Sequence, residues 1–231
     1  MKTEAEAKAI MLKSPIFQNC WGNPHKRALS FPKHRVGGGK GQLWYDMYCD
    51  ISKVLPEVKN ILNIGVGFKK AMNNETVRWM HIYDNMFGPI DRFANIDILP
   101  NIVEESAKAI KSKRITGRAA DYLRECHHGN VKDLEAIENL NGPFDIIVWS
   151  HGPEHVFRHE WVDCFDSILS MAKVVIIQLP WGQGYDSEPT HFSPSVRVGE
   201  LEKFGFRIRY AGVEDTMQAC MYGWRQGDIP C

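Results

Sequence analysis

The residues best suited to acid–base chemistry follow two apolar runs in the second half of the chain. His151 and Glu154 come directly after the run 144–149, and His191 comes some way after the run 174–179. A histidine titrates near neutral pH and can take a proton from an oxygen or nitrogen acceptor. We therefore interpret His151 and His191 as candidate bases and favour His151, which directly follows its strand. Each could instead cap or pack, and Glu154 could cap the helix that follows, because acids favour helix N-termini.

A glycine turn near residue 65 is the candidate nucleotide site. The apolar residues of 60–64 end abruptly in Gly65-Val66-Gly67. Glycine takes positive φ without steric cost and lets a ligand approach the backbone. A strand that enters a glycine turn is where α/β proteins hold nucleotides, although the same pattern also describes an ordinary tight turn. Asp97 ends the next apolar run, and its carboxylate could accept hydrogen bonds from two ribose hydroxyls.

The segments that must position these residues alternate between strands and helices from residue 42 onward. The apolar runs predict strands at 60–64, 92–96, 125–129, 144–149, 174–179, 206–210 and 217–224, with Pro180 closing the fifth and the last two paired as a hairpin. Helical spacing predicts helices at 42–54, from Pro100 onward, at 119–124, at 160–171 and at 198–204. Residues 71–90 fit no single period. This order favours one α/β domain with a doubly wound, mostly parallel sheet.

The N-terminal segment differs in charge from the rest of the chain. No acid occurs between Glu6 and Asp46, whereas seven lysines and arginines do. The segment is expected to be either a solvated basic surface or a lid that faces an anionic substrate. Residues 3–13 read as a helix and residues 14–41 as a glycine-rich loop. We divide the chain into a cap or lid at 1–57 and a main domain at 58–231.

Composition excludes several classes of protein. The 28 basic and 28 acidic residues balance, so bulk charge gives no attraction to nucleic acid. The six cysteines are scattered without a Cys-x-x-Cys pair, which favours a reducing compartment and predicts neither disulfides nor zinc. No apolar run has membrane-spanning length and the N-terminus has no signal-peptide core, so we expect a cytoplasmic protein without a membrane partner. The sequence leaves the oligomeric state open.

Four stretches together resemble the class I S-adenosylmethionine-dependent methyltransferases. Residues 60–67 resemble the first motif of that family, and the stretch 95–100 resembles the second, whose acid binds the ribose hydroxyls. Residues 144–148 with Glu154-His155-Val156 resemble the fourth strand and the Glu-His-Val that often follows it. The stretch 191–206 resembles the closing segment. The resemblance covers about residues 58–224 and implies a Rossmann-like fold with seven strands, the last antiparallel, and helices on both faces of the sheet.

The resemblance implies S-adenosylmethionine as cofactor and a set of residues that bind it. That set is Asn63, Gly65, Gly67, Asp97, Ile98, Asn130, Val131 and Ser150. Asn63 stands where the family usually has an acid, and the segment 71–90 is an insertion. Gly129-Asn130-Val131 stands where the family often has Gly-Asp beside the adenine, and Asp121 is the rival for that contact. A nicotinamide fingerprint fails on spacing, because Lys70 takes the place of the third glycine and Asp97 lies too far along.

The sequence thus predicts methyl transfer from S-adenosylmethionine to an oxygen or nitrogen of a small or sugar-like acceptor. Two alternatives stay open. The basic N-terminal segment would suit an enzyme that methylates RNA or protein, and Asn63 would suit a binding module without catalysis. His155 and His159 have the four-residue spacing of zinc ligands, but no third and fourth ligand accompanies them at zinc-site spacing, so no metal site is predicted.

Overall fold

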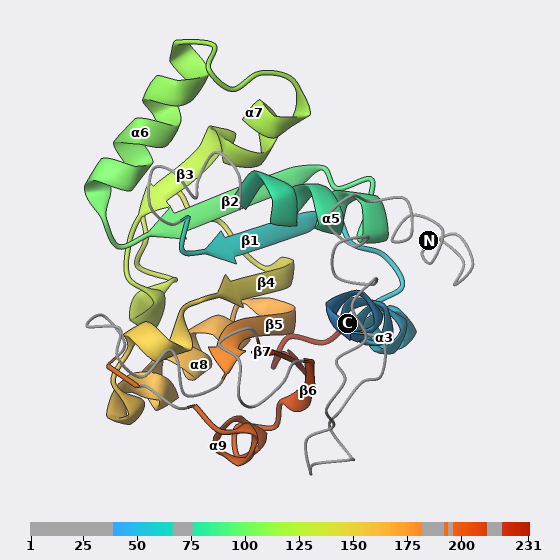
Figure 1. Cartoon of the computed structure of the whole chain (residues 1–231). Coiled ribbons are helices and arrows are strands. Elements are labelled where there is room, and N and C mark those ends of the chain that lie inside the picture. The colour runs from blue at the N-terminus through green and yellow to red at the C-terminus, as the bar shows by residue number, and fades with distance from the viewer. Residues whose placement is uncertain (1–38, 67–75, 182–191, 194–195, 212–218) are drawn as a thin grey trace.

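A single seven-stranded sheet runs through the molecule (Figure 1). The computed structural model describes residues 39–66, 76–181, 192–193, 196–211 and 219–231. The strand order is β3-β2-β1-β4-β5-β7-β6, and β7 is antiparallel to both of its neighbours. The pairs β1–β2, β1–β4, β2–β3 and β4–β5 are all parallel. The predicted fold class is therefore confirmed, including the antiparallel last strand and the final hairpin.

The strands and helices alternate along the chain. The strands are β1 (Asn60–Ile64), β2 (Arg92–Asp97), β3 (Glu125–His128), β4 (Phe144–Ser150), β5 (Ala172–Trp181), β6 (Arg207–Ala211) and β7 (Ala219–Gln226). The α-helices are α3 (Gly39–Val54), α5 (Val77–Phe87), α6 (Pro100–Lys111), α7 (Arg118–Arg124), α8 (Trp161–Leu169) and α9 (Val198–Glu202). In the described part of the chain the short 3₁₀ turns are η2 (Val131–Asp133), η3 (Pro153–His155) and η4 (Arg158–Glu160).

Alternate residues of the central strands enter two separate hydrophobic cores. In β1, Ile61 belongs to one core and Leu62 to the other. In β5, Val174 and Val175 are divided in the same way. Successive side chains of a strand point to opposite faces, so a sheet that is covered on both faces needs apolar residues at every position. This explains why the strands read as continuous apolar runs in the sequence.

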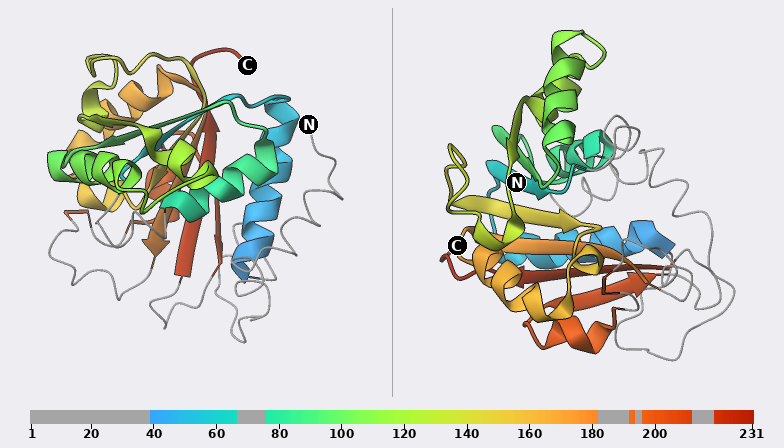
Figure 2. Two further views of the ribbon diagram at one scale, coloured as in Figure 1. Left: turned by 90° about the horizontal axis from the view of Figure 1, so that it is seen from above. Right: turned by 90° about the vertical axis from the view of Figure 1, so that its left-hand side faces the viewer.

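Two layers of helices cover the two faces of the sheet (Figure 2). Met47, Tyr48 and Ile51 of α3 share one core with α5, and α8 shares the other with Leu201 of α9. Tyr48 is therefore a packing residue. Residues 39–54, which we expected in the cap, are built into this core, whereas the division at residue 57 itself stays a prediction. No helix among the described residues has the length and apolar character needed to span a membrane.

The segment 71–90, read as an irregular insertion, contains the helix that connects β1 to β2. Within α5, Met80, Ile82, Tyr83 and Met86 are all buried against the sheet and α3. These four residues form a wide apolar stripe, which no narrow helical pattern matches. The segment therefore supplies the crossover helix that a parallel β1–β2 pair requires.

Two predicted boundaries are wrong. Gly39-Lys40-Gly41 begins helix α3 and does not end a loop, because the packing of the later turns on the sheet outweighs the poor helix propensity of glycine. Pro180 lies inside β5, pairing with Cys220 of β7. The pairing of β4 with β5 ends at Gln178. Pro180, which has no N–H, lies two positions later and therefore interrupts no hydrogen bond to β4.

Candidate functional site

The carboxyl ends of β1, β2, β3 and β4 meet at one edge of the sheet, and backbone hydrogen bonds connect the residues that follow them. The N–H of Gly65 donates to the carbonyl of Ile96 at 2.9 Å, and the N–H of Gly129 donates to the carbonyl of Asp97 at 3.1 Å. The N–H of His151 donates to the carbonyl of Gln178 on β5 at 2.7 Å. The structure thus brings four of the predicted stretches to one place, as the parallel strand order requires.

Gly65 occupies a position that favours glycine. Its φ is +82°, in the left-handed region where a side chain is strained. The turn that it makes aims the backbone N–H of Val66 at Oδ2 of Asp97, at 2.9 Å. The turn after β1 and the acid after β2 therefore form one unit. This link supports the pairing of the glycine turn with Asp97 that the sequence suggested.

The carboxylate of Asp97 is buried and accepts hydrogen bonds from the backbone after β1 and after β2. Oδ2 accepts from the N–H of Val66 and Oδ1 accepts from the N–H of Leu99, both at 2.9 Å. Each carboxylate oxygen can accept two hydrogen bonds. The side chain is 6% exposed at the edge where the ligand is expected. An acceptor-only group fixed in this way fits a pair of ribose hydroxyls, so the residues present are compatible with the cofactor.

Asn63 replaces the usual acid without leaving the turn unsupported. Its side-chain amide donates to the carbonyl of Gly65 at 3.4 Å and to Oδ1 of Asn95 at 3.2 Å. Asn95, fully buried, donates in turn to the carbonyls of Tyr122 and Glu125. A row of amides therefore ties β1 to β2 and the β3 end of α7. Asn63 thus supports the turn through its hydrogen bond to the carbonyl of Gly65, and its direct contact with the cofactor stays a prediction.

The residues predicted near the adenine lie at the same edge. Ile98, directly after Asp97, is 62% exposed, and Leu99 beside it is 42% exposed. Asn130 follows β3, and its Oδ1 accepts from the N–H of Lys132. Val131 packs partly into the core. Exposed aliphatic side chains next to a polar group are suited to one face of a flat base.

Asp121, the rival for the adenine contact, lies on α7 three residues before the last residue of that helix, Arg124. It pairs with Arg124 at 2.6 Å and approaches Arg118 at 3.9 Å. Because α7 runs directly into β3, Asp121 belongs to the amino-edge side of the sheet. These ion pairs account for its charge, so Asn130 is the better placed of the two.

His151 and Glu154 come together after β4. Nδ1 of His151 lies 3.4 Å from Oε1 of Glu154. The His151 side chain is 42% exposed, whereas that of Glu154 is 3% exposed. Glu154 lies in the first turn of η3, and its carboxylate makes no hydrogen bond to the described residues, so its role as a helix cap stays a prediction. Ser150, just before His151, donates its hydroxyl to Oε1 of Gln178 at 3.0 Å.

A pair of exposed aromatic rings, one of them three residues after Glu154, was not predicted. Phe157 and Phe192 stack with their ring centroids 4.7 Å apart and are about half exposed. Phe192 is held there because Ser193 donates to the backbone carbonyls of Glu154 and Val156. The two phenylalanines are 35 positions apart, and nothing in a single sequence shows that they meet. Gly67, His191 and the expected lid residues 1–38 lie outside the described residues.

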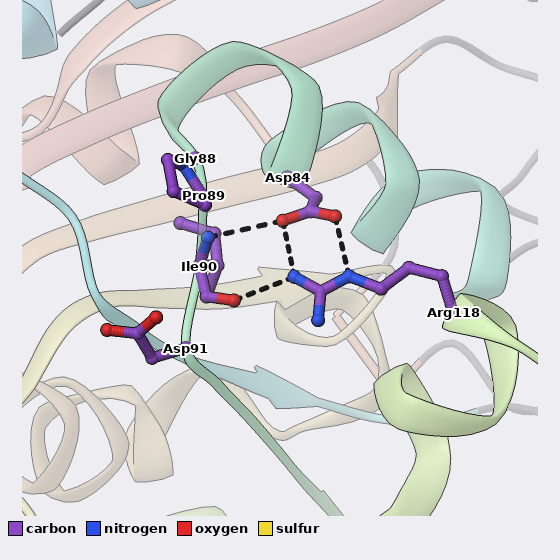
Figure 3. A pocket seen from close by; sticks show the side chains of 6 residues that line it. All are labelled: Asp84, Gly88, Pro89, Ile90, Asp91 and Arg118. Atoms are coloured by element: carbon purple, nitrogen blue, oxygen red, sulfur yellow. Dashed lines mark hydrogen bonds and ion pairs between the residues drawn. The ribbon is translucent and has the colours of Figure 1, made fainter.

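A cavity of about 670 Å³ lies at the opposite, amino edge of the sheet (Figure 3). The residues that line it are Asp84, Gly88, Pro89, Ile90, Asp91 and Arg118. Arg118 donates two hydrogen bonds to Asp84 and a third to the carbonyl of Ile90. The guanidinium that faces this cavity is thus engaged in holding α5, α7 and the start of β2 together. We assign the cavity a structural role.

This network gives a pH-dependent stability. Burial alone would raise the pKa of the Asp84 carboxyl, but Arg118, the N–H of Ile90 and the hydroxyl of Tyr122 hold that pKa below its usual value. A lowered folded-state pKa stabilises the fold at pH values above the unfolded pKa, and the stabilisation is lost as pH falls through the folded pKa. The contribution is therefore complete at pH 7, begins to fall near about pH 4 and is lost as pH falls through the lower folded-state pKa.

We expect Asp84→Asn to lower the free energy of unfolding by about 1–2 kcal/mol at pH 7, a value reduced for the partial exposure of Arg118. Urea titrations at pH 7 and pH 2.5 should show the difference between wild type and variant shrinking at the lower pH. Asp121→Asn removes the exposed pair with Arg124 and should cost less than about 0.5 kcal/mol. An equal difference at both pH values would contradict this assignment.

The comparisons with known proteins place the fold. No protein-family model matches the sequence, and no curated protein matches it. Two crystal structures of the methyltransferase domain of a bacterial CtHen1 match with TM-scores of 0.50 and 0.51 at 14% and 13% identity. Each alignment covers 80% of this chain, and 99% and 96% of those domains. The small RNA methyltransferase HEN1 matches with a TM-score of 0.50 at 13% identity, over 90% of this chain and 27% of that one. At such identity the likeness shows the fold alone.

Proposed function

We propose that this chain, which has the fold of the class I S-adenosylmethionine-dependent methyltransferases, transfers a methyl group from S-adenosylmethionine to an oxygen or nitrogen of a small acceptor. The observation that carries the proposal is the union of the glycine turn and Asp97 at the carboxyl edge. The turn at Gly65 and the carboxylate of Asp97 are joined through the N–H of Val66. This union would hold a ribose and the methionine part of the cofactor side by side.

The other residues at the edge take roles according to their surroundings. Ile98 and Asn130 would lie against the adenine, while Asn63, Gly65 and Gly67 would shape the turn under the methionine part. When bound, S-adenosylmethionine would supply a methyl group bonded to a positively charged sulfur, and that sulfur would keep the electron pair of the broken carbon–sulfur bond. His151 would take the proton of the acceptor group as that group forms its bond to carbon. The balanced charge of the chain favours a small acceptor over a polyanion.

Calorimetry with S-adenosylmethionine and with its demethylated product tests the cofactor. We expect micromolar binding of both and a higher melting temperature with either, since a ligand that binds only the folded state stabilises it. Adenosine alone should bind more weakly, because it lacks the methionine part. Absence of heat and of any thermal shift with both cofactor forms would overturn the proposal. Tight binding without turnover on any acceptor would favour a module that only binds.

A nucleic-acid acceptor is the second candidate. The observation that favours it is the exposed Phe157–Phe192 stack, which Ser193 ties to the backbone carbonyl of Glu154. Bases of single strands stack on aromatic faces, and the basic segment between Glu6 and Asp46 could contact phosphates. Titrating a labelled single-stranded RNA at 50 and 200 mM salt separates the candidates. Binding that weakens steeply with salt and is lost in Phe157→Ala would favour RNA, whereas no binding at 50 mM salt would leave the small acceptor.

A further inference from the structure

The carboxylate of Glu154 is the most unusual charged group among the described residues. It is 3% exposed, and neither of its oxygens receives a hydrogen bond from the described part of the chain. Burying an ionised carboxylate is costly unless an opposite charge or several donors compensate it. The group within ion-pair reach is the imidazole of His151, with Nδ1 3.4 Å from Oε1. Within the described part of the chain, this contact is the one that offsets the cost of burial.

The backbone around Glu154 is fixed from several sides. The N–H of Ser193 donates to the carbonyl of Glu154 at 3.0 Å, and the indole N–H of Trp161 donates to the carbonyl of Pro153 at 3.0 Å. Gly152 lies against the indole of Trp149 so closely that a side chain at that position would overlap the ring. The backbone that carries the carboxylate is consequently held in place.

His151 is held in a strained backbone conformation at the other side of the contact. Its φ is +51°, in the left-handed region that non-glycine residues rarely adopt. Such strain persists only where the surroundings enforce it, and it is concentrated at functional sites. Here the bond from its N–H to Gln178 on β5 fixes the backbone. The half-exposed imidazole can move the few tenths of an ångström that would turn the 3.4 Å contact into a hydrogen bond.

We propose that Glu154 is a positioning residue that accepts a hydrogen bond from Nδ1–H of His151 and so leaves Nε2 of His151 as the atom that takes the acceptor proton. In the neutral imidazole one nitrogen carries the proton, and the hydrogen bond at that nitrogen decides which one. The inference rests on the proposed methyl transfer, for which it supplies the base. The acceptor proton moves to Nε2, and the acceptor lone pair forms the new bond to carbon. An acceptor with an ionisable O–H or N–H suits this arrangement.

Among the described residues around the pair, Glu154 carries a carboxylate within ion-pair reach of His151. β4 and β5 contribute the neutral side chains of Ser150 and Gln178, which hydrogen-bond to one another. The segment 192–193 contributes neutral residues, and η3 contributes a second titratable group, His155. Replacing Glu154 by the isosteric glutamine removes the charge with little change of shape, so its effect on His151 isolates the electrostatic contribution.

The test is a nuclear magnetic resonance titration of the full chain with labelled histidine, with the His151 signal assigned from its absence in His151→Asn. In the wild type we expect the Nδ1–H tautomer. In Glu154→Gln the titration midpoint of His151 should fall by about one pH unit, because a neighbouring carboxylate favours the imidazolium. Glu160→Gln removes a carboxylate of the same segment that pairs with Lys132, and should leave the His151 titration unchanged.

Each outcome bears on the inference separately from the methyltransferase proposal. A wild-type His151 in the Nε2–H tautomer would overturn it, even if Glu154→Gln fails to fold. An unchanged midpoint in a folded Glu154→Gln would overturn it as well. Calorimetry with S-adenosylmethionine on the same samples tests the proposed function by itself, since neither residue is placed against the cofactor ribose. Where an acceptor is known, the acid limb of the rate profile should shift with the midpoint in Glu154→Gln.

Discussion

Asp97→Asn is expected to weaken the binding of S-adenosylmethionine by about 30- to 150-fold, equivalent to about 2–3 kcal/mol. The carboxylate would accept hydrogen bonds from both ribose hydroxyls while its two oxygens also accept from the N–H groups of Val66 and Leu99. The side chain of asparagine has one acceptor oxygen and one donor nitrogen. Its nitrogen would therefore face one of these backbone N–H groups or a ribose hydroxyl, and the hydrogen bond that the carboxylate oxygen accepts there would be lost. Calorimetry on the two proteins gives the ratio of dissociation constants directly.

The matched control for this substitution is at the other end of the same strand. Asp91 directly precedes β2 at the amino edge and is exposed. Asp91→Asn makes the same chemical change and should leave the affinity for S-adenosylmethionine within about twofold. Thermal unfolding of both variants without ligand shows how far the weakened turn lowers stability, because the Val66 contact belongs to the fold as well. Wild-type affinity in a folded Asp97→Asn would place the ribose elsewhere.

The sheet could be predicted from the sequence because burial on both faces leaves a plain signal. Strands such as β4 and β5 are apolar at most positions, and β4 ends at the polar residue Ser150. Helix α5 was missed because its buried residues form a wide stripe, and a short helix with such a stripe resembles irregular apolar sequence. Pro180 was taken as the end of β5, but the strand continues to Trp181. A proline is tolerated there because β4 no longer pairs with β5 at that position, and the sequence does not show where the pairing ends.

The candidate site could be predicted in part. The parallel order of strands brings Gly65, Asp97 and His151 to one edge, and this follows from their places after apolar runs. The burial of Glu154 could not be predicted, because it depends on Ser193 and Trp161, which reach it across turns of irregular backbone. A surface acid and a buried one have the same sequence signature after a strand. For this reason the sequence suggested a helix cap where the structure shows a buried carboxylate.

His151→Asn is expected to lower turnover by about 10²-fold or more, the usual contribution of a positioned base, while binding of S-adenosylmethionine hardly changes. Asparagine is the appropriate replacement because the φ of His151 is +51°, a conformation that asparagine tolerates better than alanine does. The variant therefore removes the imidazole and keeps the turn after β4. Its measured loss then reports on proton transfer and not on a distorted backbone.

The measurement is methyl transfer from labelled S-adenosylmethionine to an acceptor found by screening, with calorimetry on the same samples. His159→Asn is the matched control, because His159 is an exposed histidine of the same segment that stacks on Phe157. It should keep turnover within about threefold unless the acceptor lies on that ring. Near wild-type turnover in His151→Asn would show that alignment of the acceptor suffices without a base. The rate would then come from the geometry of the carboxyl edge, and the Glu154–His151 pair would serve the fold.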